Sequence, residues 1–357
     1  MALPILKSGN VTGNVYRRSV YQKLNPERKE KRAVSGENCA FFMPDSGARI
    51  AVAMDQTLYP GESGGKYAVY AAANQAAASG ARKLSGILLR ILLPEGAPEQ
   101  ALQSIAKGAK EAADRLGVSV LDTKAGVSFG VTVPLTSAVA FGEEAVFETK
   151  TARGGRGALP EDGEDAGRPA RSEESGAAGC RQVVMTKWAG LEGSVLLADR
   201  CGETLRERYP AWLLDEARGL ERYLSVQREA AAAGESGADA LCAAAEGGIF
   251  HALWTLAQRA GVGLDIDLKR IPIRQETVEI CNTLDLNPYE LLANGSLLCL
   301  SARGEELVRI FLARGIPAAV IGIAVPGNDR VVRSGDEIRF LEPAREDEIF
   351  KIWKSME

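Results

Sequence analysis

The stretch Met54–Gly80, MDQTLYPGESGGKYAVYAAANQAAASG, is the most informative part of the sequence for the fold. It begins at the end of an alternating apolar segment, passes through a turn containing Pro60 and several glycines, and continues as a run rich in alanine. Alternation predicts a β-strand, and the alanine-rich run predicts a helix over Gly65–Ser79. Gly80 follows, and glycine is the residue type that most readily adopts the left-handed cap of a helix. The stretch is therefore a strand, a turn and a helix in succession.

Elements on both sides of this stretch extend it into a domain of residues 1–150. Upstream, alternating apolar residues predict two strands joined by a turn. Downstream, apolar runs predict further strands, and apolar residues at helical spacing predict a second helix with one buried face. The expected strands are Ala40–Met43, Ile50–Met54, Leu84–Leu93, Val118–Leu121 and the segment 127–141, and the expected helix is Pro98–Leu116.

Residues 151–180 differ in composition from the rest of the chain. They include seven glycines and two prolines among mixed charges, with almost no large apolar side chains. Such a segment cannot bury enough surface to offset the entropy lost on ordering. We therefore expect a flexible insert here, between the N-terminal domain and a second domain of residues 181–357.

The second domain favours an α+β fold. Its expected strands and helices mix without the regular spacing of βαβ units, which argues against one doubly wound sheet. Helices are predicted over Leu220–Ala232 and Pro288–Leu292, among others. The expected fold class of the whole chain is α+β in two domains.

The composition excludes several classes of function. The 357 residues carry a net charge of −4, without the basic stripe that a nucleic-acid-binding protein needs. No apolar run approaches the roughly 20 residues that span a bilayer, and no signal peptide is expected. The six cysteines form no C-x-x-C pair, which fits reduced thiols. We therefore expect a cytoplasmic protein that binds neither nucleic acid nor a membrane.

Gly64-Gly65-Lys66 is the first candidate for ligand binding. The glycines open the alanine-rich helix, and a helix start offers free N–H groups and a positive dipole end that suit a phosphate. However, the segment lacks the first glycine of a P-loop and has Tyr67 in place of its Ser or Thr. An ordinary turn from loop to helix is an equally good interpretation.

Acidic residues beside predicted strands are the second candidate. Glu37 precedes one strand, Asp55 follows the next, and Asp122 follows a third. Carboxylates gathered at strand ends are the oxygen ligands that Mg²⁺ prefers when it bridges the phosphates of a nucleotide. Each of these acids taken singly is more often a turn residue.

Motifs in the first half resemble the AIR synthase superfamily. In that family an Asp after a strand, a Pro-Gly loop and a helix lead to Asn-Asp, and Asn74 matches this Asn. Gly36–Ala40 is similar to the family's Gly-acid-Asp-Ala-Ala. Asp122-Thr123-Lys124 is similar to the Gly-Asp-Thr-Lys element of the HypE-type hydrogenase maturation factors, although Leu121 stands in place of its glycine.

The second half resembles the same HypE-type branch. Thr186–Gly193 looks like the start of the second domain of archaeal and clostridial members, and Glu246-Gly247-Gly248 looks like their Glu-Gly-Gly turn. The resemblance implies a homodimer that pairs through the N-terminal domains, with an ATP and Mg²⁺ site in each chain. With the helix start included, the expected nucleotide contacts are Gly64, Gly65, Lys66, Asn74, Asp122, Lys124, Glu246 and Gly247, and the expected metal ligands are Glu37, Asp55 and Asp122.

Three departures from the family pattern predict a weakened metal site. Asn38, Gln75 and Ala243 stand where the family has acids, and none of them carries a charge. HypE enzymes also react through a cysteine on a C-terminal tail, whereas this sequence ends in Lys354–Glu357, so a reaction on its own tail is not expected.

Two functions remain open. The lost acids favour a protein that binds a nucleotide or a protein partner without full catalytic activity. The alternative is an ATP-dependent enzyme that activates an oxygen of a small molecule, or of a carbamoyl group in metallocentre maturation. The alternative rests on Asp55, Asp122 and Lys124, since a lysine beside a phosphate can neutralise the charge that is transferred.

Overall fold

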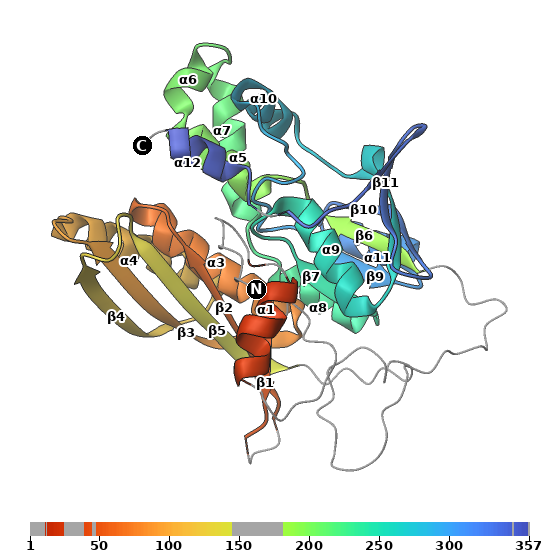
Figure 1. Ribbon diagram of the computed structural model, residues 1–357, viewed down its shortest axis with the longest axis horizontal. Helices are drawn as coiled ribbons and strands as arrows, with labels where there is room; N and C mark the ends of the chain where they lie inside the picture. The colour runs from red at the N-terminus through yellow and green to blue at the C-terminus, as the bar shows by residue number, and fades with distance from the viewer. Residues whose placement is uncertain are drawn as a thin grey trace, which may run out of the picture.

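The structure is a computed structural model that describes residues 11, 13–24, 39–44, 48–144, 181–344 and 346–355. These residues form two domains that meet along helix α3 (Gly61–Ala78), as Figure 1 shows. A short helical segment, made of α1 (Gly13–Tyr16), η1 (Arg17–Tyr21) and α2 (Gln22–Leu24), precedes them. None of the helices in these ranges is long and apolar enough to cross a membrane.

The N-terminal domain is a five-stranded sheet covered on one face by two helices. The strand order is β1-β2-β5-β3-β4, with β3 and β4 parallel and the other pairs antiparallel. Buried and less buried residues alternate along β5, as expected for a sheet with helices on one side only. The strands are β1 (Cys39–Phe42), β2 (Ile50–Thr57), β3 (Ala81–Pro94), β4 (Val120–Ser128) and β5 (Leu135–Glu144), and the second helix is α4 (Glu99–Leu116).

Helix α3 is buried along almost its whole length because it lies between the sheet and the second domain. Its many alanines allow neighbours to approach from several sides. Gly65 must be glycine because a Cβ there would overlap the backbone carbonyl of Ile105 in α4. The alanine-rich run thus marks a helix packed on all sides, which explains its weak amphipathic pattern.

The C-terminal domain contains a seven-stranded mixed sheet of order β12-β11-β8-β10-β6-β9-β7. Helices α8 (Gln227–Glu235) and α11 (Gly304–Ala313) cover one face, and α9 (Gly248–Ala260) covers the other. The strands are β6 (Gln182–Thr186), β7 (Ala240–Ala243), β8 (Gly263–Asp267), β9 (Leu297–Ser301), β10 (Ala318–Val325), β11 (Arg330–Ser334) and β12 (Glu337–Phe340).

A layer of helices caps this sheet and reaches over the start of α3. Its apolar residues share one continuous core with α3 and with the N-terminal sheet, so the two domains are joined by packing. The layer consists of α5 (Leu191–Arg200), α6 (Gly202–Arg206), α7 (Ala211–Gly219), η2 (Leu220–Tyr223), α10 (Gln275–Leu284) and α12 (Ile349–Ser355), and η3 (Leu268–Arg270) follows β8.

The structure confirms the expected α+β architecture and corrects two predicted helices. The helix expected over Leu220–Ala232 is broken between η2 and α8, where side chains from elsewhere bind the backbone. The helix expected over Pro288–Leu292 is absent, because the N–H groups of Tyr289 and Leu292 are bound by the side chains of Asn287 and Asp347. The insert 151–180 and Glu37 lie outside the described residues.

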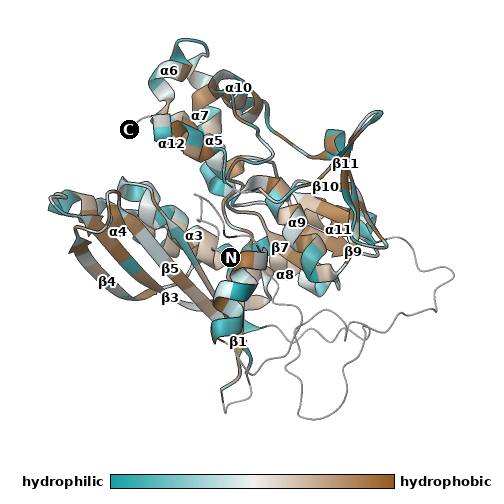
Figure 2. Ribbon diagram, in the orientation of Figure 1, coloured by the Kyte–Doolittle hydropathy of each residue, from teal (hydrophilic) through white to brown (hydrophobic). Residues whose placement is uncertain are grey.

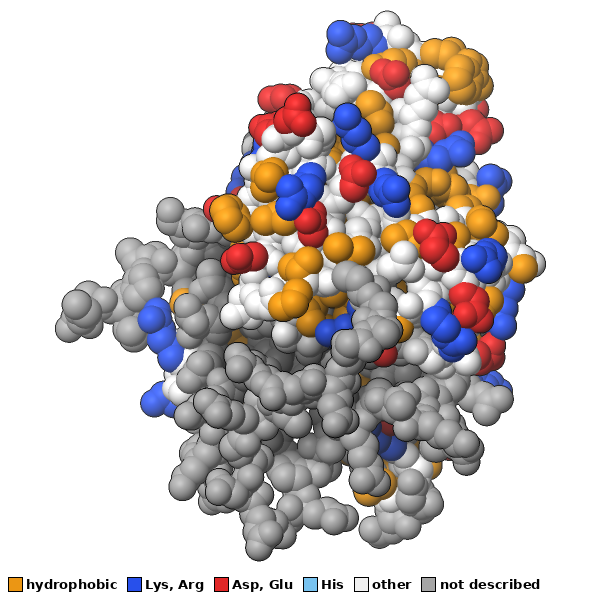
Figure 3. Space-filling model, turned by 90° about the vertical axis from the view of Figure 1, so that its right-hand side faces the viewer, with side chains coloured by type: hydrophobic (Ala, Val, Ile, Leu, Met, Phe, Trp, Pro, Cys, Tyr) orange, Lys and Arg blue, Asp and Glu red, His pale blue; other side chains and the backbone are white. Residues whose placement is uncertain are grey.

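Acidic and basic side chains are interspersed on the face drawn in Figure 3. Many charged side chains of the described residues form ion pairs within the chain, such as Arg218 with Asp199 and Arg303 with Glu306. Such exposed pairs each contribute little to stability, so the surface charges do not decide the fold.

Candidate functional site

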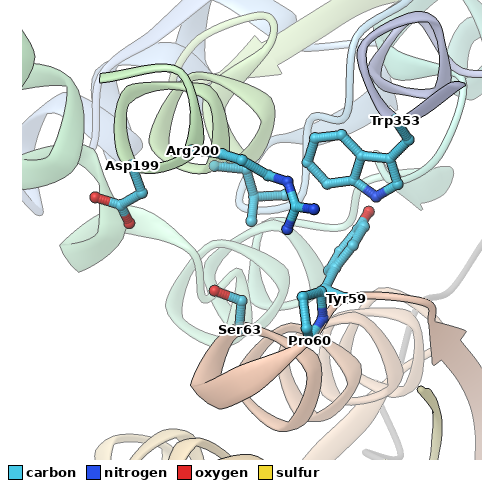
Figure 4. Close-up of a pocket in the computed structure, with 7 residues that line it drawn as sticks. Tyr59, Pro60, Ser63, Asp199, Arg200 and Trp353 are labelled. Atoms are coloured by element: carbon cyan, nitrogen blue, oxygen red, sulfur yellow. The ribbon is translucent and has the colours of Figure 1, made fainter. Parts of the chain in front are cut away.

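A pocket of about 210 Å³ opens where the two domains meet. The start of α3 supplies Tyr59, Pro60 and Ser63, and α5 and α12 supply the opposite side (Figure 4). The C-terminal domain contributes Leu196, Asp199, Arg200 and Trp353. A pocket lined from two domains is a common place for a small-molecule site.

Aromatic and basic side chains form the wall of this pocket. The ring of Trp353 meets that of Tyr59 edge to face at 5.8 Å, and the guanidinium of Arg200 lies 4.8 Å from the Trp353 ring centroid. Both interactions hold α12 against the pocket. Because Tyr59 comes from the other domain, Trp353 also fixes the width of the cleft.

Four carboxylates gather behind this pocket. Asp55 comes from β2, Glu192 from the first turn of α5, Glu246 from the turn before α9, and Asp347 from the residues before α12. Their charges interact, Asp55 with Glu192 and Glu246, and Asp347 with the same two glutamates. Tyr59 lines the pocket, and the charges of Glu192, Asp347 and Glu246 help to raise its pKa, so the carboxylates lie near the pocket without lining it. We refer to these four residues as the carboxylate cluster.

Two members of the carboxylate cluster are bound by hydrogen bonds. Glu192 accepts from the amide of Asn294 at 2.6 Å. Asp347 accepts three backbone N–H groups, those of Gly247 (2.7 Å), Ile349 (2.9 Å) and Leu292 (3.2 Å). Asp55 accepts only from its neighbour Gln56 among the described residues, and no hydrogen bond to Glu246 is found among them. The oxygens of Asp55 and Glu246 are therefore the ones available to a ligand.

Burial raises the pKa of every carboxyl in the cluster. The pKa of Glu192 rises to about 8, and those of Glu246 and Asp347 to about 7. That of Asp55 rises to about 6. The cause is loss of hydration, strengthened by repulsion between the members, with no basic side chain among the causes. Carboxyls that titrate near neutral pH in a cleft are typical of functional sites.

The carboxylates do not converge into a finished metal site. Within the described ranges no three His, Cys, Asp or Glu side chains are grouped closely enough to hold an ion. Mg²⁺ often uses only one or two protein carboxylates, together with waters and substrate phosphates. Asp55 and Glu246, one from each domain, are the pair that fits this use.

Gly64, Gly65 and Lys66 have packing and ion-pair partners in the structure. Cβ atoms at the two glycines would overlap the backbones of Tyr59 and Ile105. The ammonium of Lys66 lies 2.9 Å from Glu221 and 3.4 Å from Glu111. Packing therefore explains the two glycines, and ion pairing explains Lys66, without any need for a bound phosphate.

Asn74 joins the two domains. Its side chain is fully buried, its amide donates to the carbonyl of Leu224 at 2.8 Å, and its oxygen accepts from the N–H of Val226 at 2.9 Å. These bonds break the helix predicted over Leu220–Ala232. Gln75 and Ala243, two of the uncharged residues at the positions where acids were expected, are also buried.

Asp122 and Lys124 lie apart from the carboxylate cluster. They are exposed on β4, which is separated from β2 and Asp55 by two strands. They pair with Leu88 and Arg90 of β3, on the face of the sheet that α3 and α4 leave uncovered. Within one chain the structure therefore brings Asp55 and Glu246 together and leaves Asp122 and Lys124 elsewhere.

Glu192 and Asp347 were missed by the sequence reasoning. Glu192 lies within the motif Thr186–Gly193, where an acid in the first turn of a helix resembles an ordinary helix start. Asp347 precedes α12 as a capping residue. Only the folded arrangement shows that both are buried and that their charges interact with those of other carboxylates of the cluster.

Comparison with known proteins identifies the family. Residues 36–143 match the model described as AIR synthase related protein, N-terminal domain, and residues 181–334 match the corresponding C-terminal domain. Carbamoyl dehydratase HypE of Rhodobacter capsulatus is 27% identical over 312 residues, which cover 82% of this chain and 80% of that protein.

Solved structures of HypE share the fold. HypE in complex with ATP aligns with a TM-score of 0.61 at 17% identity, covering 94% of this chain and 95% of that one. A chain of the HypE–HypF complex aligns with a TM-score of 0.62 at 19% identity, covering 90% and 98%. Because the two family models together span most of its length, this chain belongs to the AIR synthase related family and is similar to HypE.

Proposed function

We propose that this protein binds a nucleotide in the cleft between its domains, through a metal site weaker than a fully acidic one would be. We further propose that it acts by binding the nucleotide or a protein partner rather than by efficient turnover. The observation that carries the proposal is the carboxylate cluster, whose members Asp55 and Glu246 have oxygens free to face a ligand.

Electrostatics make a cation necessary for tight binding in this cleft. The phosphates of ATP are negative, and an acidic cleft repels them unless protons or a metal intervene. Asp55 and Glu246 can supply one ligand each to Mg²⁺. Glu192 and Asp347 are tied to Asn294 and to backbone N–H groups, so they can reach a metal only by giving up those bonds.

Burial at the substituted positions supports a weakened site. Ala243 packs in the core beside α8 and α11, and Gln75 is buried in α3. Neither position offers a charged oxygen to the cleft. With two free carboxylates, we expect nucleotide affinity to be low and to change little when Mg²⁺ is removed.

The aromatic pocket offers a place for the base. Trp353 and Tyr59 are large planar side chains beside the carboxylate cluster. A purine gains dispersion and stacking energy on such surfaces. Binding of ATP by HypE, stated for the solved complex, supports the assignment of the ligand class.

We also propose that two copies pair through the uncovered face of the N-terminal sheet. Helices cover the other face, and this one exposes Met54, Leu88 and Leu121 by 67%, 40% and 57%. Hydrophobic residues are abundant along β3 and β4 (Figure 2). Pairing would bury these side chains, and Asp122 and Lys124 would lie in or beside the interface. The proposal of a protein partner is supported by the complex that HypE forms with HypF.

An ATP-dependent enzyme is the second candidate. It is favoured by the carboxyls that titrate near neutral pH and by the name of the relative, carbamoyl dehydratase. Such an enzyme needs Mg²⁺ to stabilise the charge that develops during transfer.

Calorimetric titration with ATP, with Mg²⁺ and then with EDTA, separates the two candidates. We expect a Kd weaker than roughly 100 μM that changes less than about tenfold in EDTA. Binding at low micromolar Kd that disappears in EDTA would establish the enzyme candidate instead.

A further inference from the structure

A second pocket, of about 300 Å³, lies on the C-terminal domain between the segment Leu220–Glu229 and the loop 315–317. None of its lining residues belongs to the carboxylate cluster or to the aromatic pocket. Its polar lining comprises Lys187, Arg222, Ser225, Arg228 and Glu229. The pocket is thus more basic than acidic, in contrast to the cleft between the domains.

Lys187 is a buried residue that lines this pocket. Its backbone has φ of 57°, an unfavourable value for a residue with a side chain. The ammonium donates to the carbonyls of Tyr223 and Ser225 at 2.7 Å each and pairs with Glu229 at 2.7 Å. Its three N–H groups are therefore used, and the charge of Glu229 is neutralised inside the protein.

Two guanidinium groups remain uncompensated at the rim. Arg222 lies over the ring of Tyr223, 4.9 Å from its centroid, and Arg228 donates to the carbonyl of Arg314 at 2.9 Å. Neither forms a salt bridge with any of the residues that the structure describes. These contacts hold both side chains beside the pocket while leaving further N–H groups free.

The start of α8 adds backbone donors to the same wall. Ser225, Arg228 and Glu229 surround the first turn of this helix, and Ser225 accepts the N–H of Gln227. The first turn of a helix has N–H groups without partners inside the helix. The wall therefore combines two guanidiniums, a serine and backbone donors around one cavity.

We propose that this second pocket binds the phosphate group of a small phosphorylated molecule. Guanidinium groups bind the oxygens of a phosphate through paired, charge-assisted hydrogen bonds, and two of them match its double negative charge. The volume leaves room for a small organic part, bounded by Ile316 and Pro317. Two exposed cations are too few to hold a nucleic acid backbone.

A ligand in the second pocket would also contact a segment that joins the two domains. The segment Leu220–Glu229, which forms one wall, is the segment that Asn74 of α3 binds at Leu224 and Val226. A ligand that bridges this wall to the loop 315–317 stabilises the folded state by mass action. Ligand binding should therefore raise the melting temperature of the whole chain.

Titration with inorganic pyrophosphate, without metal, tests the proposal on the full chain. We expect calorimetric binding that weakens with added salt, together with a rise in melting temperature. Changing both Arg222 and Arg228 to Ala should weaken the affinity at least tenfold. Arg206→Ala, an exposed change on α6, is the matched control and should bind as the wild type does. No binding to the wild type, or equal binding by the double variant, would overturn the proposal.

A variant of the cleft separates this site from the proposed nucleotide site. Glu246→Gln leaves the second pocket intact, so pyrophosphate should bind this variant as it binds the wild type. Circular dichroism checks that the double arginine variant is folded, and Arg222→Lys with Arg228→Lys should retain part of the affinity. If Glu246→Gln changes pyrophosphate binding while the arginine variant does not, the anion binds in the cleft and the second pocket is not a site.

Discussion

Two buried polar regions lie at the junction of the domains, and they differ in how their charges are compensated. In the first region, Asn74 binds the backbone of Leu224 and Val226, Lys66 pairs with Glu221, and Lys187 binds the carbonyls of Tyr223 and Ser225 and pairs with Glu229. We refer to these contacts, which leave out the exposed Arg222 and Arg228, as the compensated region. In the carboxylate cluster, burial and neighbouring acids raise the pKa values of the four carboxyls, and no basic side chain of the described residues is among the causes. The first region holds the domains together, whereas the second retains free polar atoms at the cost of stability. Buried polar groups at the same junction can thus stabilise the fold or bind a ligand. Groups whose charges and hydrogen bonds are satisfied within the chain stabilise the fold, and groups with free polar atoms are available to a ligand.

Removing Lys187 should break the compensated region and have the largest effect. Lys187→Met leaves Glu229 and the carbonyls of Tyr223 and Ser225 buried without their donor. Loss of one partner of a buried ion pair typically costs about 3–5 kcal/mol of unfolding free energy. Urea unfolding measures it. Lys107→Ala, in an exposed pair with Glu62, is the control and should change stability little. A similar small loss in both variants would show that Lys187 is not a structural centre.

The carboxylate cluster should make stability fall as pH rises. The pKa of Glu192 is about 8 in the folded chain, above its ordinary value, so the folded state binds more protons than the unfolded state between those values. The free energy of unfolding therefore decreases through this window, by on the order of 3 kcal/mol between pH 5 and pH 8 for this group.

Glu192→Gln isolates that contribution. A neutral amide should flatten the pH dependence and raise stability at pH 8 relative to the wild type, as measured by urea unfolding at several pH values. Glu203→Gln, on the exposed side of α6, should leave the profile unchanged. An unchanged profile in Glu192→Gln would mean that this carboxyl is ionised and compensated at neutral pH.

Asn74 should contribute less than Lys187 because its partners are neutral. Asn74→Ala leaves the carbonyl of Leu224 and the N–H of Val226 buried without a partner, which costs about 2 kcal/mol. The exposed Asn282→Ala serves as the control. Thermal unfolding measures the loss of stability in both variants. A loss for Asn74→Ala no larger than that of the control would show that Asn74 does not stabilise the junction of the domains.

The elements of the fold could be predicted from the sequence better than the contacts between distant residues. The α+β class and most elements followed from periodicity, because apolar spacing records which face is buried. The start of α3 at Gly61 was missed, since Gly61, Gly64 and Gly65 resemble a loop in sequence, and the close contacts of Gly64 with Tyr59 and of Gly65 with α4 appear only in the fold. The break after η2 could not be foreseen, because Asn74 lies about 150 residues away along the chain.

The candidate site was only partly predictable for the same reason. Asp55 and Glu246 were identified from motifs, and the fold brings them close enough for their charges to interact. Asp122 seemed equivalent to Asp55 in sequence, yet the strand order places two strands between them. Glu192 and Asp347 resemble ordinary helix starts in the sequence. They become candidates for function only in the fold, where the charge of Asp347 helps to raise the pKa of Glu192.

Titration of MgATP into the wild type and into the double variant Asp55→Asn, Glu246→Gln tests the central claim most directly. We expect weak binding by the wild type, and we expect its small dependence on Mg²⁺, less than about tenfold, to be lost in the double variant. Lys66→Ala, a change in the compensated region, should retain that dependence. Equal MgATP binding by the wild type and the double variant would contradict the claim that the carboxylate cluster is the nucleotide site.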